Sequence, residues 1–136
     1  MDCLFCKIIK KEISARIIYE DNSVIGFLDI NPQAPGHTIV IPKDHVENIL
    51  ELTPKKIGPF FDAVQKITNN LKKGLSPDGF TIGINQGEAS GQTIPHLHVH
   101  IMPRFQNDGG GSLHCVVNNP PKRNLDEIAR KIHGIS

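Results

Sequence analysis

The stretch His96-Leu97-His98-Val99-His100-Ile101-Met102 places a histidine at every second position and an apolar residue between each pair. Successive side chains of a β-strand point to opposite faces, so this alternation predicts three imidazoles on one face and a buried apolar face behind them. Alternate residues of a strand are about 6.6–6.8 Å apart, which lets neighbouring rings converge. Threonine or lysine would serve a merely solvated strand equally well. The row of histidines therefore predicts a functional site.

Chemistry alone leaves two kinds of site open for this histidine strand. In the first, two alternate histidines and a third ligand hold a catalytic zinc ion with an open position for water. In the second, a neutral imidazole attacks phosphorus or a carbonyl carbon, since an ordinary histidine pKa of about 6.5 leaves a nitrogen lone pair at neutral pH. The preceding loop, Gly87-Glu88-Ala89-Ser90-Gly91-Gln92-Thr93, has small residues, backbone N–H groups and a hydroxyl that suit a phosphate. The loop favours the second kind of site.

Hydrophobic periodicity in the rest of the chain predicts an antiparallel fold. Helices are expected over residues 3–10, 53–74 and 125–131, and strands over 16–20, 24–28, 37–41, 80–85, 95–102 and 113–117. Gly58-Pro59 predicts that the long helix starts late or kinks. The consecutive hairpin-like strands lack the crossover helices of a parallel sheet. The expected class is therefore α+β, with an antiparallel β-sheet, one long helix and short terminal helices.

Two further expectations concern burial. The long helix should bury one apolar face, whose members recur at helical spacing: Ile57, Phe60, Phe61, Val64, Ile67 and Leu71. In the strand expected over 113–117, Cys115 stands beside Val116 and Val117 and is predicted to be a small buried apolar residue.

Length and composition narrow the class of protein. The 136 residues are expected to form a single domain over 1–136, with its core in about 2–105 and a tail over 106–136 that contains a flexible connection at 107–111. The formal net charge of +1 argues against a nucleic-acid or acidic-membrane binder. The apolar runs stop after four or five residues, whereas a bilayer helix needs about twenty. With no secretory signal pattern and only three cysteines, a cytoplasmic protein is expected.

Several stretches together resemble one protein family. The histidine strand, with its two apolar residues after His100, resembles the defining motif of the histidine triad (HIT) superfamily. The other matching stretches follow in the family's order: Cys3-Leu4-Phe5-Cys6-Lys7-Ile8-Ile9, Phe27-Leu28-Asp29-Ile30, Gly36-His37-Thr38-Ile39-Val40-Ile41-Pro42-Lys43-Asp44-His45, and Asn85 through Gly91-Gln92-Thr93. The resemblance covers about residues 2–105, and residues 106–136 match less clearly.

The resemblance implies an enzyme that cleaves nucleotides at the α-phosphate through a nucleotidyl-histidine intermediate. His98 would be the nucleophile, and His100 and His37 would flank the phosphate. The implied substrates are purine nucleoside phosphoramidates or dinucleoside polyphosphates. The chain has no tryptophan, whereas the phosphoramidase branch typically closes its leaving-group side with a tryptophan-containing tail, so the leaving group stays open. The alternatives are a phosphorylase that passes the nucleotidyl group to phosphate, and a non-catalytic nucleotide-binding or scaffold protein.

The resemblance also implies a set of nucleotide-binding residues. Thr93, Gly91 and Gln92 would hold the phosphate, and Asn85 would contact the phosphate or the sugar side of the loop. Asp29 would bind the ribose cis-diol, although an aspartate before Asn31-Pro32 is also typical of a turn. The base pocket would be walled by Phe27, Leu28 and Ile30.

A metal site is implied at the N-terminus. By themselves, Cys3 and Cys6 fit a redox motif, a metal half-site or a chance pair on a helix, with the redox motif least favoured because only two residues precede Cys3. The resemblance implies that Cys3, Cys6, His45 and His96 form a closed Cys₂His₂ site for a structural zinc ion. It further implies a homodimer.

Overall fold

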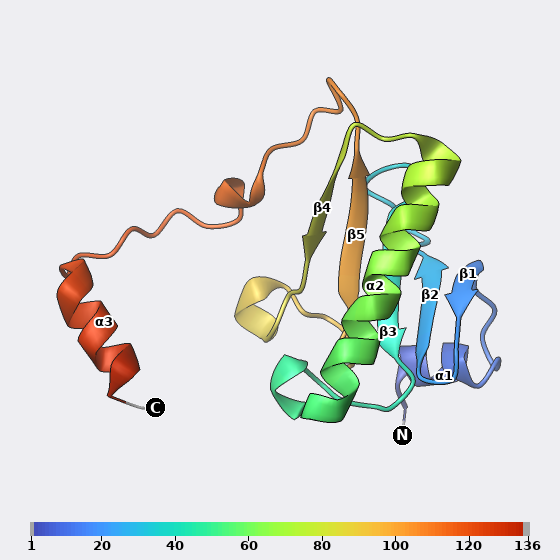
Figure 1. Ribbon diagram of the computed structural model, residues 1–136, viewed down its shortest axis with the longest axis horizontal. Helices are drawn as coiled ribbons and strands as arrows, with labels where there is room; N and C mark the ends of the chain where they lie inside the picture. The colour runs from blue at the N-terminus through green and yellow to red at the C-terminus, as the bar shows by residue number, and fades with distance from the viewer. Residues whose placement is uncertain (1, 135–136) are drawn as a thin grey trace.

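The computed structural model describes residues 2–134 and shows an antiparallel sheet with helices on both faces. The sheet has five strands in the order β1-β2-β3-β5-β4. The strands are β1 (Ile17–Glu20), β2 (Val24–Leu28), β3 (Thr38–Pro42), β4 (Gly79–Gly83) and β5 (Val99–Arg104). The helices are α1 (Leu4–Ile9), α2 (Pro54–Leu75) and α3 (Leu125–His133), with short 3₁₀ turns η1 (Ile49–Glu51), η2 (Glu88–Ser90) and η3 (Leu113–Cys115) (Figure 1). The predicted α+β class with an antiparallel sheet is confirmed.

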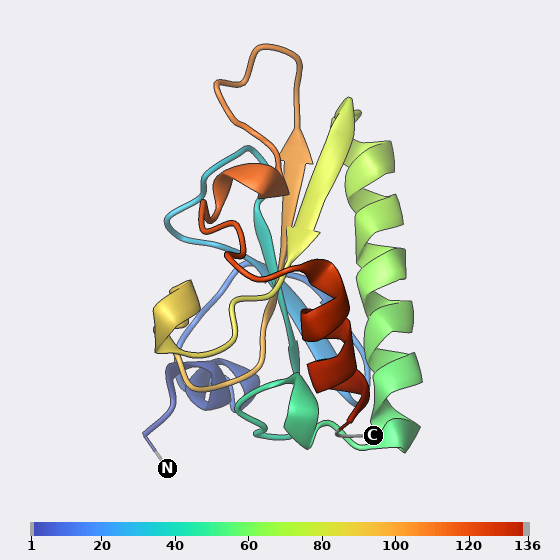
Figure 2. The same cartoon turned by 90° about the vertical axis from the view of Figure 1, so that its left-hand side faces the viewer.

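The two faces of the sheet have different partners. Figure 2 shows α2 along one face and α1, η2 and η3 on the opposite side. Leu97, Val99 and Ile101 belong to the core cluster that also contains the buried face of α2. A second cluster, built around Phe5 of α1 and Ile39 of β3, fills the other face. The apolar residues of the histidine strand therefore face α2, as the alternation predicts, and the histidines lie on the α1 side.

Helix α2 departs from the expectation at its start and along its face. It begins at Pro54 and runs through Pro59 as one helix, so the predicted late start is wrong. Proline there removes the hydrogen bond to the Lys55 carbonyl, and this turn is exposed, so water can replace the partner. Ile57 and Phe61 are about 40% exposed and lie at the edge of the apolar face, whose other predicted members are buried.

Strand β5 begins at Val99, four residues later than the sequence predicts. Residues 95–98 lie outside the strand because pairing with β3 stops at Val40↔Val99 and Pro95 has no N–H to donate. The Leu97 N–H instead donates to the Val46 carbonyl at 2.7 Å. His96 and His98 are nevertheless both buried, and both rings pack edge-on against Phe5 of α1.

The tail after β5 differs most from the expectation. Residues 113–115 form the 3₁₀ turn η3 rather than a strand, and Cys115 is exposed rather than buried. Gly109–Gly111 precede this segment, and the Ser112 hydroxyl caps the turn at the His114 N–H. No strand of the sheet formed by the described residues offers it a hydrogen-bond ladder. Figure 1 shows α3 standing apart from the sheet.

Among the described residues 2–134, none of the helices combines the length and the apolar composition that a membrane-spanning helix requires.

Candidate functional site

A pocket of about 410 Å³ lies between α1 and the histidine face of the sheet. Of the residues predicted to act on a nucleotide, nine line it: Phe27, Leu28, Asp29, Ile30, Asn85, Gly91, Thr93, His98 and His100. Sequence reasoning missed the wall opposite the sheet, which is formed by Leu4, Phe5, Ile8, Ile13, Ser14 and Ala15. We refer to this cavity as the nucleotide pocket, after the ligand that the sequence predicts for these residues.

The hydrogen bond of His98 fixes which ring nitrogen is free. Its Nδ1 lies 2.7 Å from the His96 carbonyl oxygen. A carbonyl only accepts, so Nδ1 carries the proton and donates it, which leaves the lone pair on Nε2. The side chain is 6% exposed, and the ring of Phe5 packs edge-on against it with centroids 5.1 Å apart. The orientation of the His98 ring is thus fixed, and one of its nitrogens is available to a reacting group.

His37 and His100 form a hydrogen-bonded chain beside this ring. The Gln33 N–H donates to Nδ1 of His37 at 3.1 Å, so the His37 proton is on Nε2. That Nε2 lies 3.0 Å from Nδ1 of His100 and donates to it. The His100 proton is therefore on its own Nε2, as a second donor at the pocket. Sequence reasoning missed Gln33, because a backbone amide leaves no signature in residue type.

Burial keeps both of these rings neutral. Desolvation lowers the pKa of His100 to about 4, and the neighbouring His98 and His37 act in the same direction. Desolvation also lowers the pKa of His37, against the opposing charge of Asp29. Neutral rings keep the alternation of donors and acceptors that the chain requires.

Asp29 faces both the pocket and the histidine chain. Its Oδ1 accepts from the Asn31 N–H at 2.9 Å, which is the turn role anticipated for this residue. Its Oδ2 lies 3.6 Å from Nε2 of His37. Asp29, His37 and His100 are close enough to hold a metal ion, but a His37 Nε2 that carries a proton has no lone pair to give. The hydrogen bonds fit a proton chain better than a metal site.

The loop before the histidine strand is held rigid by its own polar groups. Gly87 and Gly91 have positive φ values of 85° and 97°, which favour glycine at both positions. Gln92 does not line the nucleotide pocket. Its Oε1 accepts from the Gly87 N–H at 2.8 Å, its Nε2 donates to the Glu47 and Ile94 carbonyls, and its own N–H donates to the Gly87 carbonyl. Gln92 therefore braces the loop that presents Gly91 and Thr93.

A second cluster brings together the four residues predicted as metal ligands. Cys3, Cys6, His45 and His96 offer donor atoms that all lie within 4.8 Å of one another. Cys6 Sγ is 3.2 Å from Nδ1 of His45 and 3.7 Å from Nδ1 of His96, and Cys3 Sγ is 3.6 Å from the latter. Zn–S and Zn–N bond lengths in a tetrahedral site give S···N distances of about 3.6 Å.

The surroundings of this cluster also suit a metal ion. His96 donates from Nε2 to the Pro42 carbonyl at 2.8 Å, which leaves its Nδ1 lone pair directed at the two sulfurs. Burial raises the pKa of the Cys6 thiol, so its ionised form needs a cation nearby. The donor set and its outer hydrogen bond fit a closed metal site.

Fold and site together define an α+β protein whose histidines gather on one face of the sheet, beside the glycine-containing loop at 87–93. The HIT domain family matches residues 10–107, and the chain belongs to this family. An uncharacterised HIT-like protein of Methanocaldococcus jannaschii is 43% identical over 132 residues, which cover 97% of this chain and 99% of that protein.

Two other similar proteins extend the comparison. The crystal structure of a HIT family member from Bacillus subtilis has a TM-score of 0.87 and 36% identity, and covers 99% of this chain and 95% of that one. A protein of Arabidopsis thaliana named adenylylsulfatase is 39% identical over 107 residues, which cover 79% of this chain and 54% of that protein.

Proposed function

We propose that this HIT protein cleaves purine nucleoside phosphoramidates or dinucleoside polyphosphates at the α-phosphate, through a nucleotidyl intermediate on His98. The observation that carries the proposal is the 2.7 Å hydrogen bond from His98 Nδ1 to the His96 carbonyl, because it leaves Nε2 as a free nucleophile in the nucleotide pocket. The match to the HIT family supports the nucleotide class of substrate.

The first step forms a phosphorus–nitrogen bond. Nε2 of His98 attacks the α-phosphorus while the bond to the leaving group breaks, and the leaving group takes the electron pair. His100 supplies the proton that the leaving group needs from its Nε2. Nδ1 of His100 keeps the hydrogen bond from His37 Nε2, which stabilises the negative charge left on the His100 ring. The new bond to phosphorus leaves a positive charge on the His98 ring, and this charge offsets the one on His100.

The second step returns the enzyme to its starting state. Water attacks the phosphorus, the bond to His98 breaks, and Nε2 recovers its lone pair. The proton of the water returns to Nε2 of His100. Splitting the reaction replaces one difficult displacement by water with two displacements that each have a better nucleophile or leaving group.

The nucleotide is held by groups around this centre. Thr93 binds the phosphate beside Gly91, whose own N–H is already donated to the Glu88 carbonyl. Asn85 contacts the sugar side of the phosphate, and Asp29 binds the ribose cis-diol. Phe27, Leu28 and Ile30 wall the base, and the α1 residues that line the pocket close its other side. Gln92 contributes through the loop that it braces.

We further propose that the cluster of Cys3, Cys6, His45 and His96 holds a structural zinc ion. Zinc would supply a tetrahedral link between the N-terminal segment and the sheet, with no position left open for water. Because α1 carries Phe5 between this cluster and His98, the metal site would also keep the wall of the nucleotide pocket in place.

An activity panel on one zinc-analysed preparation tests the function. Adenosine 5′-phosphoramidate, a dinucleoside tetraphosphate and adenylyl sulfate are each offered with and without inorganic phosphate. We expect AMP release from at least one of them without phosphate, and rapid quench with labelled nucleotide should trap an acid-labile, base-stable adduct on His98. ADP formation only in the presence of phosphate would make the protein a phosphorylase. Absence of turnover and of adduct would leave a nucleotide-binding protein.

A further inference from the structure

Helix α1 contributes side chains to the candidate metal cluster and to the nucleotide pocket. Cys3 is its N-cap and Cys6 lies in its first turn, and both belong to the candidate metal cluster. Three other residues of the same helix, Leu4, Phe5 and Ile8, line the nucleotide pocket. A helix of six residues thus presents one set of side chains to a metal ion and another set to a nucleotide.

Side chains, and not backbone hydrogen bonds, hold α1 against the sheet. Among the described residues, the backbone hydrogen bonds of residues 3–13 stay within that segment. The buried side chains of Phe5 and Ile8 pack in the apolar cluster that contains Ile39 of β3. Just beyond the helix, Lys11 bonds Glu20 at 2.8 Å, but both side chains are partly exposed, so this pair contributes little. The position of α1 therefore depends on its apolar packing and on the candidate metal cluster.

Phe5 touches a residue of each site. Its ring packs edge-on against His96 of the metal cluster, with centroids 5.9 Å apart, and against His98, with centroids 5.1 Å apart. The same ring packs against Phe27 in the wall of the nucleotide pocket at 5.6 Å. Because Phe5 is only 3% exposed, it cannot shift without moving these neighbours. Leu4, one residue earlier, lines the same pocket but is 44% exposed.

The backbone of His96 makes a second connection between the two sites. Its Nδ1 faces the two sulfurs of the metal cluster, and its carbonyl oxygen accepts the Nδ1 proton of His98. A metal ion on the His96 ring would therefore fix the residue whose carbonyl orients the proposed nucleophile.

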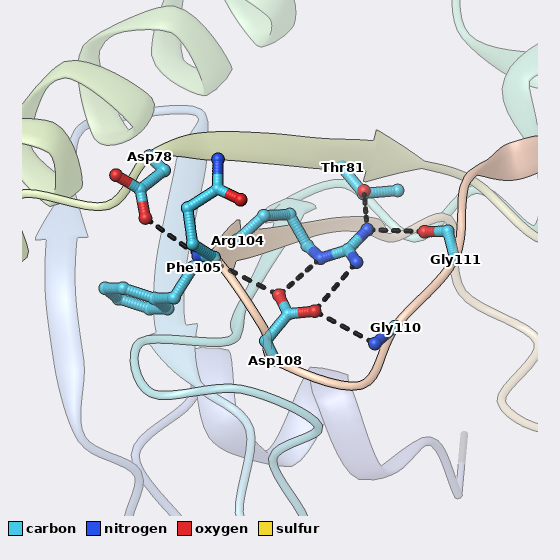
Figure 3. A network of polar contacts seen from close by, with 8 residues as sticks. Asp78, Thr81, Arg104, Phe105, Asp108, Gly110 and Gly111 are labelled. Atoms are coloured by element: carbon cyan, nitrogen blue, oxygen red, sulfur yellow. Dashed lines mark hydrogen bonds and ion pairs between the residues drawn. The ribbon is translucent and has the colours of Figure 1, made fainter.

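The opposite end of the histidine strand is held by polar groups alone (Figure 3). The Arg104 guanidinium donates to both carboxylate oxygens of Asp108, at 2.8 and 3.0 Å, and to the Thr81 hydroxyl at 3.0 Å. Neither Arg104 nor its two partners line the nucleotide pocket or belong to the metal cluster. This network therefore offers a control for substitutions that merely destabilise the fold.

We propose that α1 couples the two sites, so that a bound nucleotide retains the metal ion and the metal ion strengthens nucleotide binding. This inference rests on the proposed function. The nucleotide packs on the side chains of α1 only while the helix lies against the sheet, and loss of the metal ion frees the end of the helix that carries the cysteines. Because the two binding free energies are linked, each ligand raises the affinity of the other by the same factor.

Competition with a chromophoric zinc chelator measures this coupling on the zinc-loaded, full-length protein. We expect saturating AMP to raise the zinc affinity of the wild type about tenfold. In the reverse direction, removal of zinc should weaken AMP binding, measured by titration calorimetry, by the same factor. A zinc affinity that is equal with and without AMP would overturn the coupling.

Phe5→Leu and Leu4→Ala form a matched pair of variants. Both alter the α1 wall of the pocket, but only Phe5 contacts the rings of both His96 and His98. With AMP saturating each variant, the effect of AMP on zinc affinity should fall below about threefold in Phe5→Leu and stay near the wild-type factor in Leu4→Ala. Asp108→Asn weakens the Arg104 network and should also keep the wild-type factor. Equal factors in all three variants would show that AMP acts through the stability of the whole fold, and would overturn the role of α1.

Hydrogen exchange on the zinc-loaded wild type gives a second readout that needs no variant. AMP should slow the exchange of the α1 amides severalfold more than that of the β4 amides, because the nucleotide packs directly on α1. Uniform slowing of both elements would overturn the coupling through α1.

The outcomes separate this inference from the proposed function. A wild-type protein that does not bind AMP would overturn the proposed nucleotide site, and a protein that does not bind zinc would overturn the proposed metal site. Either result would overturn the coupling as well. Independent binding of AMP and zinc would overturn the coupling alone and leave cleavage by His98 intact.

Discussion

Two histidine clusters lie side by side on one face of the sheet, and they differ in the partner of the second ring nitrogen. His96 gives its Nε2 proton to the Pro42 carbonyl and turns Nδ1 toward two sulfurs. His98, two residues later, gives its Nδ1 proton to the His96 carbonyl and keeps Nε2 for the pocket. The same side chain in one segment is thus a candidate metal ligand in the first case and a candidate nucleophile in the second.

The comparison teaches that backbone groups assign the chemistry of each imidazole. A carbonyl forces the nitrogen it faces to carry the proton, as for His96 and His98, whereas the Gln33 N–H forces His37 to accept. Ring position along the strand decides which imidazoles meet. The backbone partner then decides which of them donates, accepts or binds a metal ion.

The largest expected effect comes from removing the proposed nucleophile. His98→Ala should lower kcat by several powers of ten, because the covalent route disappears, while nucleotide affinity measured by calorimetry stays within a few-fold. Thr93→Ala is the comparison variant, since loss of one phosphate donor should lower kcat only about 10²–10³-fold. Turnover of His98→Ala near the wild-type rate would contradict the assignment, as would a trapped label on Thr93.

The next largest effect separates the metal cluster from the catalytic one. Purified protein should contain about one zinc per chain, and Cys3→Ser should lose it and melt on the order of 10 °C lower, because a structural metal contributes directly to folding. The exposed Cys115 offers the control, and Cys115→Ser should keep both zinc and melting temperature. Zinc-free protein of unchanged stability would show that the four residues are not a metal site.

The sequence predicts those features of the two clusters that depend on the alternation of residues along a strand. Alternation along the histidine strand places His98 and His100 on one face and Leu97 in the core, and the structure agrees. The tail shows the limit of the same reasoning. Cys115-Val116-Val117 has strand-like residues, but a strand needs a neighbour, and no strand of the described sheet lies next to it.

Contacts between residues that are far apart in the sequence could be predicted only from the family resemblance, or had to be seen in the structure. Cys6 and His45 are separated by 39 positions, and only the resemblance paired them before the structure placed Cys6 Sγ 3.2 Å from His45 Nδ1. The role of Gln33 depends on where a peptide N–H points, and that of Phe5 on how α1 folds over the sheet. Neither the direction of that N–H nor the packing of α1 can be predicted from the residue types alone.

A smaller effect, on nucleotide affinity, is expected at Asp29, the proposed ribose contact beside His37. Asp29→Ala should weaken binding of ribonucleotides about 10–100-fold, as expected for charge-assisted hydrogen bonds to a cis-diol. Binding of 2′-deoxynucleotides should weaken much less, because one of those bonds is already missing. Titration calorimetry with AMP and its 2′-deoxy analogue measures the difference. Equal losses for both sugars would assign Asp29 to the Asn31 turn and the His37 contact alone.

The smallest expected effect is the pH dependence that burial gives to the catalytic cluster. The pKa of His100 is lowered to about 4, whereas an unfolded histidine titrates near 6.5. Between these values the unfolded chain binds the extra proton, so the free energy of unfolding falls as the pH falls from about 6.5 toward 4. From pH 7.5 to 5.0 the zinc-loaded wild type should therefore lose about 1–2 kcal/mol more stability in urea than zinc-loaded His100→Asn. Protonation of the metal ligands affects both proteins alike and cancels in this difference. Equal losses would show that His100 is charged at pH 5, and that the neutral hydrogen-bonded chain from Gln33 to His100 does not persist there.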